Sequence, residues 1–293
     1  MIREAAGATE RDRRVAPEII EALRAAGLFR MFLPRDLGGD EHDPVAVGRA
    51  VEEVSAADGS TGWCVMIAAQ NASFAGLLPA EEARRVWGDG GIVAGTVRPN
   101  GRFVRVSAPG EGYLVSGRWP IASGSSHATW FVCEGVIHDG AAPRLDAQGN
   151  PQTTMALIPR DQVTIIDTWD TLGLRGTASN DFVAEGAFVP ASRCFQLLGH
   201  EPVHPWPLYR ALALAFVPHG SQALGVARAA IEAVIRIAAT KPASGAPGKL
   251  RDQPRLQLAL AEAVALRESA SAFLYEATDA CWQGLLAGDD DPR

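Results

Sequence analysis

Residues 1–90 consist of segments with helical hydrophobic spacing that are separated by short turns. Apolar side chains recur on one face between Pro17 and Ala26, and Pro44 follows an acidic N-cap at the start of a second helix. A third segment, Thr61–Leu78, is apolar on nearly every side and is therefore predicted to be buried. A fourth helix begins at Pro79. This pattern predicts an N-terminal α-helical domain over residues 1–90.

The pattern changes after Gly91 to short β-branched or aromatic runs separated by Gly, Pro, Asn and Asp. The runs are Ile92–Val97, Phe103–Val106, Tyr113–Val115, Trp130–Val136, Thr154–Ile158, Val163–Trp169 and Asp181–Val189. No helical segment lies between them, so they predict a middle β-domain over residues 91–200, an antiparallel barrel or sandwich. The polar stretch 141–152 is expected to be an exposed loop.

Helical spacing returns from Leu208 onward, with one apolar stripe from Leu224 to Ile235 and another from Leu256 to Leu274. Pro218 is expected to kink or interrupt the start of the first of these helices. Two antiparallel helices cannot bury both apolar faces by themselves. Residues 201–293 therefore predict part of a helical bundle that self-associates, and we expect a homo-oligomer, a dimer or a tetramer. The fold class is α+β multidomain.

Composition and charge exclude several classes of function. The chain has 293 residues, of which 47% are hydrophobic, a net charge of −7 and a pI near 5.4, so no basic surface is available for nucleic acid. No apolar run reaches the ~18 residues of a membrane span, and the charged N-terminus does not resemble a secretory signal. The four cysteines are scattered without a C-x-x-C pair, as is typical of reduced thiols in a cytoplasmic protein.

The stretch Gly112–Val132 carries the clearest candidate chemistry. Two hydrophobic runs flank a segment of small residues in which Gly124 lacks a Cβ and Ser123, Ser125 and Ser126 present hydroxyls close together. Such a segment can be an ordinary serine-rich hairpin connection, or it can lie flat against a planar ligand. Sequence reasoning from these residue types alone leaves both interpretations open.

Other common sites lack their signals. The sequence has no G-x-G-x-x-G after a strand, no Walker A lysine motif, no H-E-x-x-H and no G-x-S-x-G. The histidines do not have a metal-binding spacing, because His200 and His204 are four residues apart but neighbouring prolines keep them off a helix face. We therefore predict no metal site.

The run SGRWPIASGSSHATW resembles the flavin-contacting segment of the acyl-CoA dehydrogenase family. Within that family it is most similar to the two-component, reduced-flavin-dependent hydroxylases, whose pattern Ser-Gly-x-x-His-Ala-x-Trp is reproduced by Ser123, Gly124, His127, Ala128 and Trp130. The opening of the third helix, Gly-Ser-x-Gly-Trp, also resembles this branch. The resemblance places Ser123 as the catalytic group that hydrogen-bonds flavin N5.

A second segment, WDTLGLRGTASNDFVAEGAFVP, resembles the turn and last barrel strand of the family. The cofactor-binding residues that the resemblance implies are Thr96, Val97, Pro99, Ile121, Ala122, Ser123, Gly124, Trp169, Thr177, Ser179 and Lys241. Of these, the backbone around Thr96–Pro99 is expected at either the dimethylbenzene or the pyrimidine edge of the flavin. Alternative interpretations are that Trp169 is barrel core, Arg175 a surface ion pair and Lys241 a solvated loop residue.

The resemblance implies a flavin-dependent monooxygenase that takes reduced FMN or FAD from a separate flavin reductase and uses O2 on a small organic substrate. An alternative function is that of an FAD-dependent acyl-CoA dehydrogenase. Against it, the acidic T-E-P-G-x-G-S-D run of the dehydrogenases is absent, and Thr96–Gly101 stands in its place. Family members usually continue further and complete a four-helix bundle. The second alternative is therefore a truncated, non-catalytic family member or an oligomerisation partner.

Overall fold

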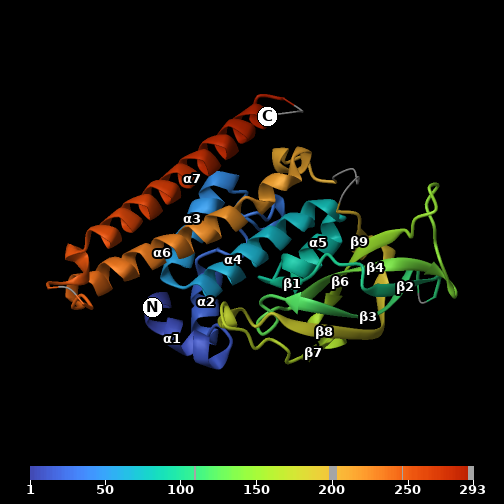
Figure 1. The fold of residues 1–293 in the computed structure, drawn as a ribbon. Helices are drawn as coiled ribbons and strands as arrows, with labels where there is room; N and C mark the ends of the chain where they lie inside the picture. The colour runs from blue at the N-terminus through green and yellow to red at the C-terminus, as the bar shows by residue number, and fades with distance from the viewer. Residues whose placement is uncertain (109, 198–202, 246, 290–293) are drawn as a thin grey trace.

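The computed structural model describes residues 1–108, 110–197, 203–245 and 247–289. Helices gather on one side of the molecule and a twisted sheet lies on the other, and the chain passes from helices to strands and back to helices (Figure 1). The predicted α+β architecture, helical at both ends with a β-domain in the middle, is therefore confirmed. The predicted boundary at residue 200 lies outside the described residues.

The N-terminal helices follow the predicted pattern, with one addition. They are α1 (Ile2–Asp12), α2 (Pro17–Ala25), α3 (Pro44–Ala57), α4 (Gly59–Ala72) and α5 (Ala80–Trp87). The Asp43 carboxylate caps α3 by accepting a hydrogen bond from the Ala46 N–H at 2.8 Å. Sequence reasoning missed α1, because its polar sequence has no apolar stripe, and extended α4 too far, because the chain tightens into a 3-10 turn at Ser73–Leu77.

The middle part is a mixed sheet. Its strands are β1 (Val93–Gly95), β2 (Gly101–Val106), β3 (Gly112–Ala122), β4 (Trp130–Asp139), β5 (Ala142–Pro143), β6 (Thr153–Pro159), β7 (Thr164–Ile166), β8 (Asn180–Pro190) and β9 (Cys194–Phe195). The main order is β7-β8-β3-β2-β4-β6-β9, and β1 and β5 both pair with β4.

The prediction of a purely antiparallel β-domain is wrong for two strand pairs, because β1 and β2 both run parallel to β4. The chain reverses once between β2 and β3 and again between β3 and β4, so β4 points the same way as β2 and pairs with its free edge. The expected loop at 141–152 is mostly exposed, with β5 and a bridge between Leu145 and Pro151 inside it.

Two hydrophobic cores hold these parts together. One lies among the N-terminal helices and extends to β1, β6 and the C-terminal helices. The other fills the inside of the sheet around Phe103, Trp119, Phe131 and Phe182, where the rings of Trp119 and Phe182 stack at 5.1 Å. Helix α4 contacts β1 on one side and α3 and α6 on others, which explains why it is apolar nearly all round. It therefore forms the link between the sheet and the helices.

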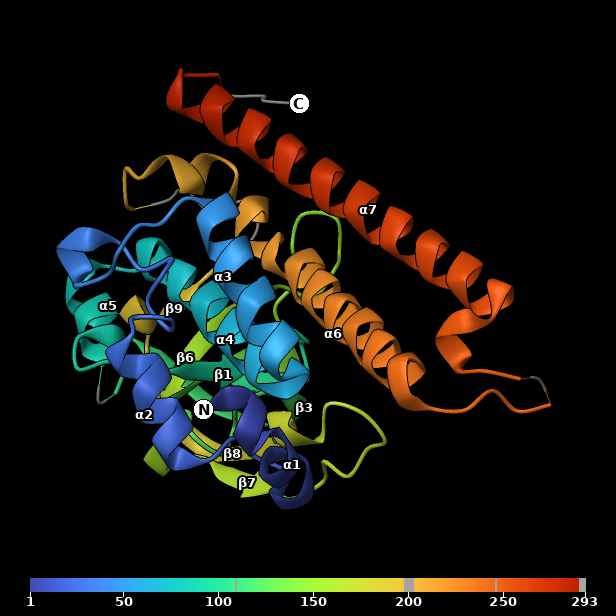
Figure 2. The ribbon, with the colours of Figure 1, turned by 90° about the vertical axis from the view of Figure 1, so that its left-hand side faces the viewer.

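The C-terminal part begins with two 3-10 turns, Pro207–Arg210 and Leu212–Phe216, and continues into α6 (Pro218–Thr240) and α7 (Pro254–Leu286). Pro218 does not kink α6 as expected. It is the first residue of the helix, where its missing N–H costs nothing. Helix α7 runs along the outside of the molecule beside α6 (Figure 2). None of the helices in the described residues is long and apolar enough to cross a membrane.

Candidate functional site

The turn that follows β3 contains the candidate serine. The pairing of β3 with β8 shifts register between Trp119 and Ala122, and Ile121 adopts a φ of 63°. A β-branched residue with positive φ is strained, and Ile121 is also 46% exposed, so packing does not explain its conformation. The positive φ of Ile121 turns the chain so that Ser123 points inward, where it is 5% exposed.

A row of hydroxyl groups starts at Ser123. Its Oγ lies 2.8 Å from the Ser179 Oγ, which lies 2.6 Å from the Thr177 Oγ1. The Thr177 hydroxyl donates in turn to the Leu174 carbonyl at 2.9 Å. At the other end the Trp63 indole N–H donates to the Ser123 Oγ at 2.9 Å. We call the row of Ser123, Ser179 and Thr177 the hydroxyl chain.

The segment that carries Thr177 and Ser179 is held rigidly against the Ser123 turn. Leu174 and Ala178 both adopt left-handed conformations, which folds residues 174–178 into a tight turn. The Ser125 hydroxyl donates to the Ala178 carbonyl at 2.6 Å, and the Gly124 N–H donates to the Thr177 carbonyl at 2.8 Å. These bonds fix the geometry of the hydroxyl chain.

The loop after β1 carries three further predicted residues, Thr96, Val97 and Pro99. Strand β1 contacts β3, which places Thr96 and the residues after it beside the end of β3. The Thr96 N–H donates to the Val132 carbonyl at 3.1 Å, whereas the Val97 N–H has no partner among the described residues. Val97 and Pro99 are exposed. Free backbone donors on an exposed loop can bind the carbonyl oxygens of a ligand.

Two aromatic side chains outside the predicted set pack together at the Ser123 end of the hydroxyl chain. The Trp63 indole donates to Ser123, and the rings of Trp63 and His219 lie T-shaped with 5.8 Å between centroids. The His219 Nδ1–H donates to the Phe216 carbonyl at 3.0 Å, which leaves Nε2 as a free acceptor among the described residues. The sequence signal for Trp63 was the Gly-Ser-x-Gly-Trp motif, whereas nothing in the sequence marked His219.

The structure brings together only part of the predicted set. Ser123, Thr177 and Ser179 are in direct contact, and Ile121, Ala122 and Gly124 belong to the same turn. Trp169 is half-buried and joins this group indirectly, through its indole N–H, which donates to the Leu174 carbonyl at 3.0 Å, and its backbone N–H, which donates to the Asn180 side chain at 3.0 Å.

Two other residues lie outside this group. Arg175 pairs with Asp170 and lies 3.7 Å from Glu10, so it forms the surface ion pairs of the alternative interpretation. Lys241 follows the last residue of α6, at the far end from His219, a separation of roughly 33 Å at the helical rise per residue. It is exposed, and the role that the resemblance implies for it, toward a neighbouring subunit, stays a prediction.

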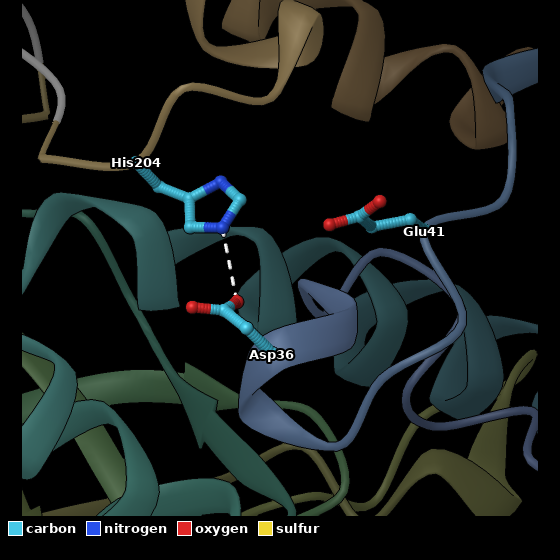
Figure 3. A group of neighbouring side chains, drawn as sticks. All are labelled: Asp36, Glu41 and His204. Atoms are coloured by element: carbon cyan, nitrogen blue, oxygen red, sulfur yellow. Dashed lines mark hydrogen bonds and ion pairs between the residues drawn. The ribbon is translucent and has the colours of Figure 1, made fainter.

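One cluster of side chains has the composition of a metal site. Asp36, Glu41 and His204 each bring a ligand atom within 4.8 Å of the others, and Figure 3 shows Asp36 and Glu41 on the two sides of the His204 ring. The His204 Nδ1 accepts a hydrogen bond from the Trp206 N–H at 3.1 Å, so the neutral ring carries its proton on Nε2. That proton is donated to Asp36 at 3.0 Å. The cluster is therefore a hydrogen-bonded pair beside a carboxylate. His200 lies outside the described residues.

Comparison with known proteins places the whole chain in one family. Residues 1–85 match the family model "Acyl-CoA dehydrogenase, N-terminal domain", and residues 217–292 match "Acyl-CoA dehydrogenase, C-terminal domain". The indole-3-acetate monooxygenase of Pseudomonas putida is 34% identical over 292 residues, which cover 98% of this chain and 72% of that protein. The oxygenase component of the FADH(2)-dependent resorcinol hydroxylase from Rhizobium sp. is 30% identical, over 94% of this chain and 69% of the relative.

Solved structures give the same result. The crystal structure of 3-HSA hydroxylase from Rhodococcus sp. RHA1 superimposes with a TM-score of 0.84 at 28% identity, covering 99% of this chain and 75% of that chain. The HsaA monooxygenase from M. tuberculosis superimposes with a TM-score of 0.81, also at 28% identity, over 99% of this chain and 75% of that one. The chain belongs to the acyl-CoA dehydrogenase family, within its branch of flavin-dependent monooxygenases.

Proposed function

We propose that the chain is the oxygenase component of a two-component monooxygenase, which binds reduced FMN or FAD released by a separate flavin reductase. One atom of O2 enters a small organic substrate and the other leaves as water. The observation that carries this proposal is the Ser123 Oγ, which is fixed by the hydroxyl chain and lies beside an exposed, strained turn. The names of the relatives, an indole-3-acetate monooxygenase and a resorcinol hydroxylase, favour an aromatic substrate.

The residues at the site suit a reduced flavin. The Ser123 Oγ has a lone pair that can accept a hydrogen bond from the flavin N5–H. The free N–H of Val97 suits a carbonyl oxygen of the pyrimidine edge better than the apolar dimethylbenzene edge, and this supports placing the pyrimidine edge at the loop. Ile121 presents an exposed apolar surface on which a flat ring can rest.

Reduced flavin, when bound, supplies the two electrons that the activation of O2 requires. The part of this chain is to orient and shield the ring. Ser123 holds the proton at N5 by accepting it in a hydrogen bond. Trp63 adds aromatic surface that excludes water from the neighbourhood of that bond, and His219 packs against Trp63. His219, with its free Nε2, provides an acceptor for a hydroxyl or N–H group of a substrate beside Trp63.

The dehydrogenase alternative is less well supported. The acidic run that the dehydrogenases carry before β2 is replaced by Thr96–Gly101, in which Arg98 stands. The named relatives over nearly the full chain are monooxygenases. We also propose a homo-oligomer, because α6 and α7 leave a shared apolar groove open to solvent.

Replacement of Ser123 tests the proposal. Ser123→Ala removes one hydrogen bond at N5, a loss of roughly 1–3 kcal/mol in a water-poor site. We expect less hydroxylated product and more H2O2 per reduced flavin consumed, while the affinity for reduced flavin changes less. Ser126→Ala, an exposed serine in the same turn, is the control and should behave like the wild type.

The experiment mixes photoreduced FMN or FAD with the protein and substrate without oxygen, and then adds 18O-labelled O2. Resorcinol and indole-3-acetate are the first substrates to test, with product and peroxide quantified in parallel. Labelled oxygen in the product supports the monooxygenase assignment. Failure of the wild-type chain to bind either reduced flavin would contradict it, and equal peroxide yields from wild type and Ser123→Ala would contradict the contact at N5.

A further inference from the structure

The ends of the hydroxyl chain determine the direction in which its protons point. The Trp63 indole N–H can only donate a hydrogen bond, and the Leu174 carbonyl can only accept one. When Thr177 donates its proton to Leu174 at 2.9 Å, its oxygen is left to accept from Ser179 at 2.6 Å, and every hydroxyl proton of the chain has an acceptor, whereas the reverse direction leaves the Ser123 proton without one among the described residues. Ser179 can then only accept from Ser123 at 2.8 Å. All three hydroxyl protons point away from Trp63 and toward Leu174.

This direction leaves Ser123 able to accept a further hydrogen bond but unable to donate one. Its proton is used on Ser179, and one of its two lone pairs is used by Trp63. The N5 of a reduced flavin carries a hydrogen and donates, whereas the N5 of an oxidised flavin has only a lone pair and accepts. We propose that the Thr177 bond to Leu174, acting through Ser179 on Ser123, sets how strongly this site prefers reduced over oxidised flavin. The inference rests on the proposed function, in which Ser123 contacts N5.

The number of hydrogen bonds differs between the complexes with reduced and with oxidised flavin. With reduced flavin, five bonds form: N5 to Ser123, Trp63 to Ser123, and the three that run from Ser123 to Leu174. With oxidised flavin, the Ser123 hydroxyl must rotate so that it donates to N5. Either its bond to Ser179 is then lost, or all three hydroxyls rotate and Thr177 turns away from Leu174, and in both cases four bonds remain. The Leu174 carbonyl tolerates the loss of the Thr177 hydroxyl because the Trp169 indole N–H and the Thr177 backbone N–H also donate to it, at 3.0 and 3.2 Å. The reduced state thus has one more hydrogen bond.

The same count separates the residues that set the preference from a neighbour that does not. Thr177→Val removes the acceptor for the Ser179 proton, so in the reduced complex that proton has no partner, while the reversed chain is fully paired. Ser179→Ala has the corresponding effect on the proton of Ser123. Trp63→Phe removes one bond from both states and leaves their difference unchanged. Thr177→Ser keeps the hydroxyl and should keep the preference.

The test measures the dissociation constants of oxidised and reduced FMN and FAD for the full chain, with the reduced forms titrated under anaerobic conditions. The readout is the ratio of the oxidised to the reduced constant. In Thr177→Val and Ser179→Ala we expect this ratio to fall at least tenfold from its wild-type value. Tenfold corresponds to about 30 mV in the two-electron midpoint potential of the bound flavin, which a spectroelectrochemical titration measures independently. In Trp63→Phe and Thr177→Ser the ratio should stay within about threefold.

The outcomes distinguish this inference from the function on which it rests. A tenfold fall of the ratio in the two variants that break the chain, with the ratio kept in Trp63→Phe, supports it. An unchanged ratio in Thr177→Val and Ser179→Ala, while all variants still bind reduced flavin, overturns it and leaves the proposed function intact. An equal fall in Trp63→Phe shows that general loosening of the site is responsible and also overturns it. If the wild-type chain binds no flavin, both the inference and the proposed function are rejected.

Discussion

What a single residue does in this site depends on whether its polar group donates a hydrogen bond, accepts one, or can do both. A serine hydroxyl between two other hydroxyls can point its proton either way, and only the donor at Trp63 and the acceptor at Leu174 remove that freedom. His127, in the same turn as Ser123, shows the opposite situation. Its ring packs against Phe29 at 6.2 Å, and among the described residues its Nε2 has no partner.

Desolvation of the half-buried His127 ring makes the stability of the fold depend on pH. Burial, together with the charge of Arg24, lowers the pKa of His127 to about 4 from its usual 6.5. In the unfolded chain His127 binds a proton below about pH 6.5, whereas in the folded chain it does so only near pH 4. The free energy of unfolding therefore falls as the pH falls through this window. The loss at pH 4 amounts to about 3 kcal/mol. We expect His127→Phe, which keeps a ring against Phe29, to lose this part of the pH dependence.

Urea unfolding at pH 7, 5.5 and 4 measures this difference. The free energy of unfolding of the wild type should fall more steeply than that of His127→Phe across the series. His42→Gln, which changes an exposed histidine, should follow the wild type. Parallel curves for wild type and His127→Phe would show that the His127 ring is not the cause.

At the scale of elements, a buried charge pair joins the N-terminal helices to α7. Glu52 on α3 is 5% exposed, and its carboxylate binds both the Arg267 guanidinium and the Tyr275 hydroxyl, the latter at 2.7 Å. Both partners lie on α7, and Arg49 of α3 stacks over the Tyr275 ring at 4.3 Å. Polar groups that satisfy one another in this way fix how α7 is rotated and placed against α3.

Removal of one partner should cost more than removal of both. Arg267→Met leaves the Glu52 carboxylate buried without its cation, and we expect a loss of about 3–5 kcal/mol in the free energy of unfolding. The double variant Glu52→Gln with Arg267→Met removes the unpaired charge and should recover part of that loss. Arg228→Ala breaks a pair with Glu53 whose carboxylate is 70% exposed, so it should cost less than about 1 kcal/mol. Urea unfolding measures all three, and an Arg267→Met cost as small as that of Arg228→Ala would contradict the argument.

Elements with a strong periodic pattern were predictable from the sequence, and those without one were not. Helix α3 had both an N-cap and an apolar stripe, whereas α1 is polar and had no such signal. Helix α1 packs against the 174–178 turn, where Gly176 leaves space for Thr9. The parallel pairing of β2 with β4 depends on which edge of β2 is free. A sequence pattern contains no information about that choice.

The candidate site was predictable to a similar degree. Ser123, Thr177 and Ser179 followed from two resembling segments, but their mutual contact is a property of the fold, since Ser123 and Ser179 are 56 residues apart. The group that fixes the direction of the chain is the Leu174 carbonyl, and side-chain types along a sequence do not mark a backbone oxygen. Trp63 was part of a motif without an assigned partner, and His219 reaches the site only because α6 begins beside α4.

At the scale of the whole molecule, the site forms where three parts of the chain meet. The sheet provides Ser123 and Ser179, the N-terminal helices provide Trp63, and α6 provides His219. The C-terminal helices also leave apolar surface in contact with solvent. A groove of about 660 Å³ between α6 and α7 is lined almost entirely by apolar side chains, and Phe273 and Leu266 beside it are 76% and 72% exposed.

This surface predicts association of two copies of the chain through α6 and α7. Patches of this size on a soluble protein mark contact surfaces, and a two-fold contact would bury each side chain twice. Burial of a Phe side chain contributes about 1.5–3 kcal/mol, so two copies of Phe273→Asp should weaken a dimer by a factor on the order of a hundred or more. We expect wild-type chain to sediment as a dimer or larger species at micromolar concentration and Phe273→Asp to sediment as a monomer.

The control must change an equally exposed apolar residue away from the groove. Leu172 lies on the loop between β7 and β8 and is 100% exposed, so Leu172→Asp adds the same charge without touching α6 or α7. Sedimentation velocity on the three proteins across a concentration series then separates an effect of the groove from an effect of charge. Only a contact centred on α6 and α7 makes Phe273 matter more than Leu172. If Leu172→Asp dissociates the dimer as strongly as Phe273→Asp, or if the wild type is already monomeric, the groove is therefore not the surface through which copies of the chain associate.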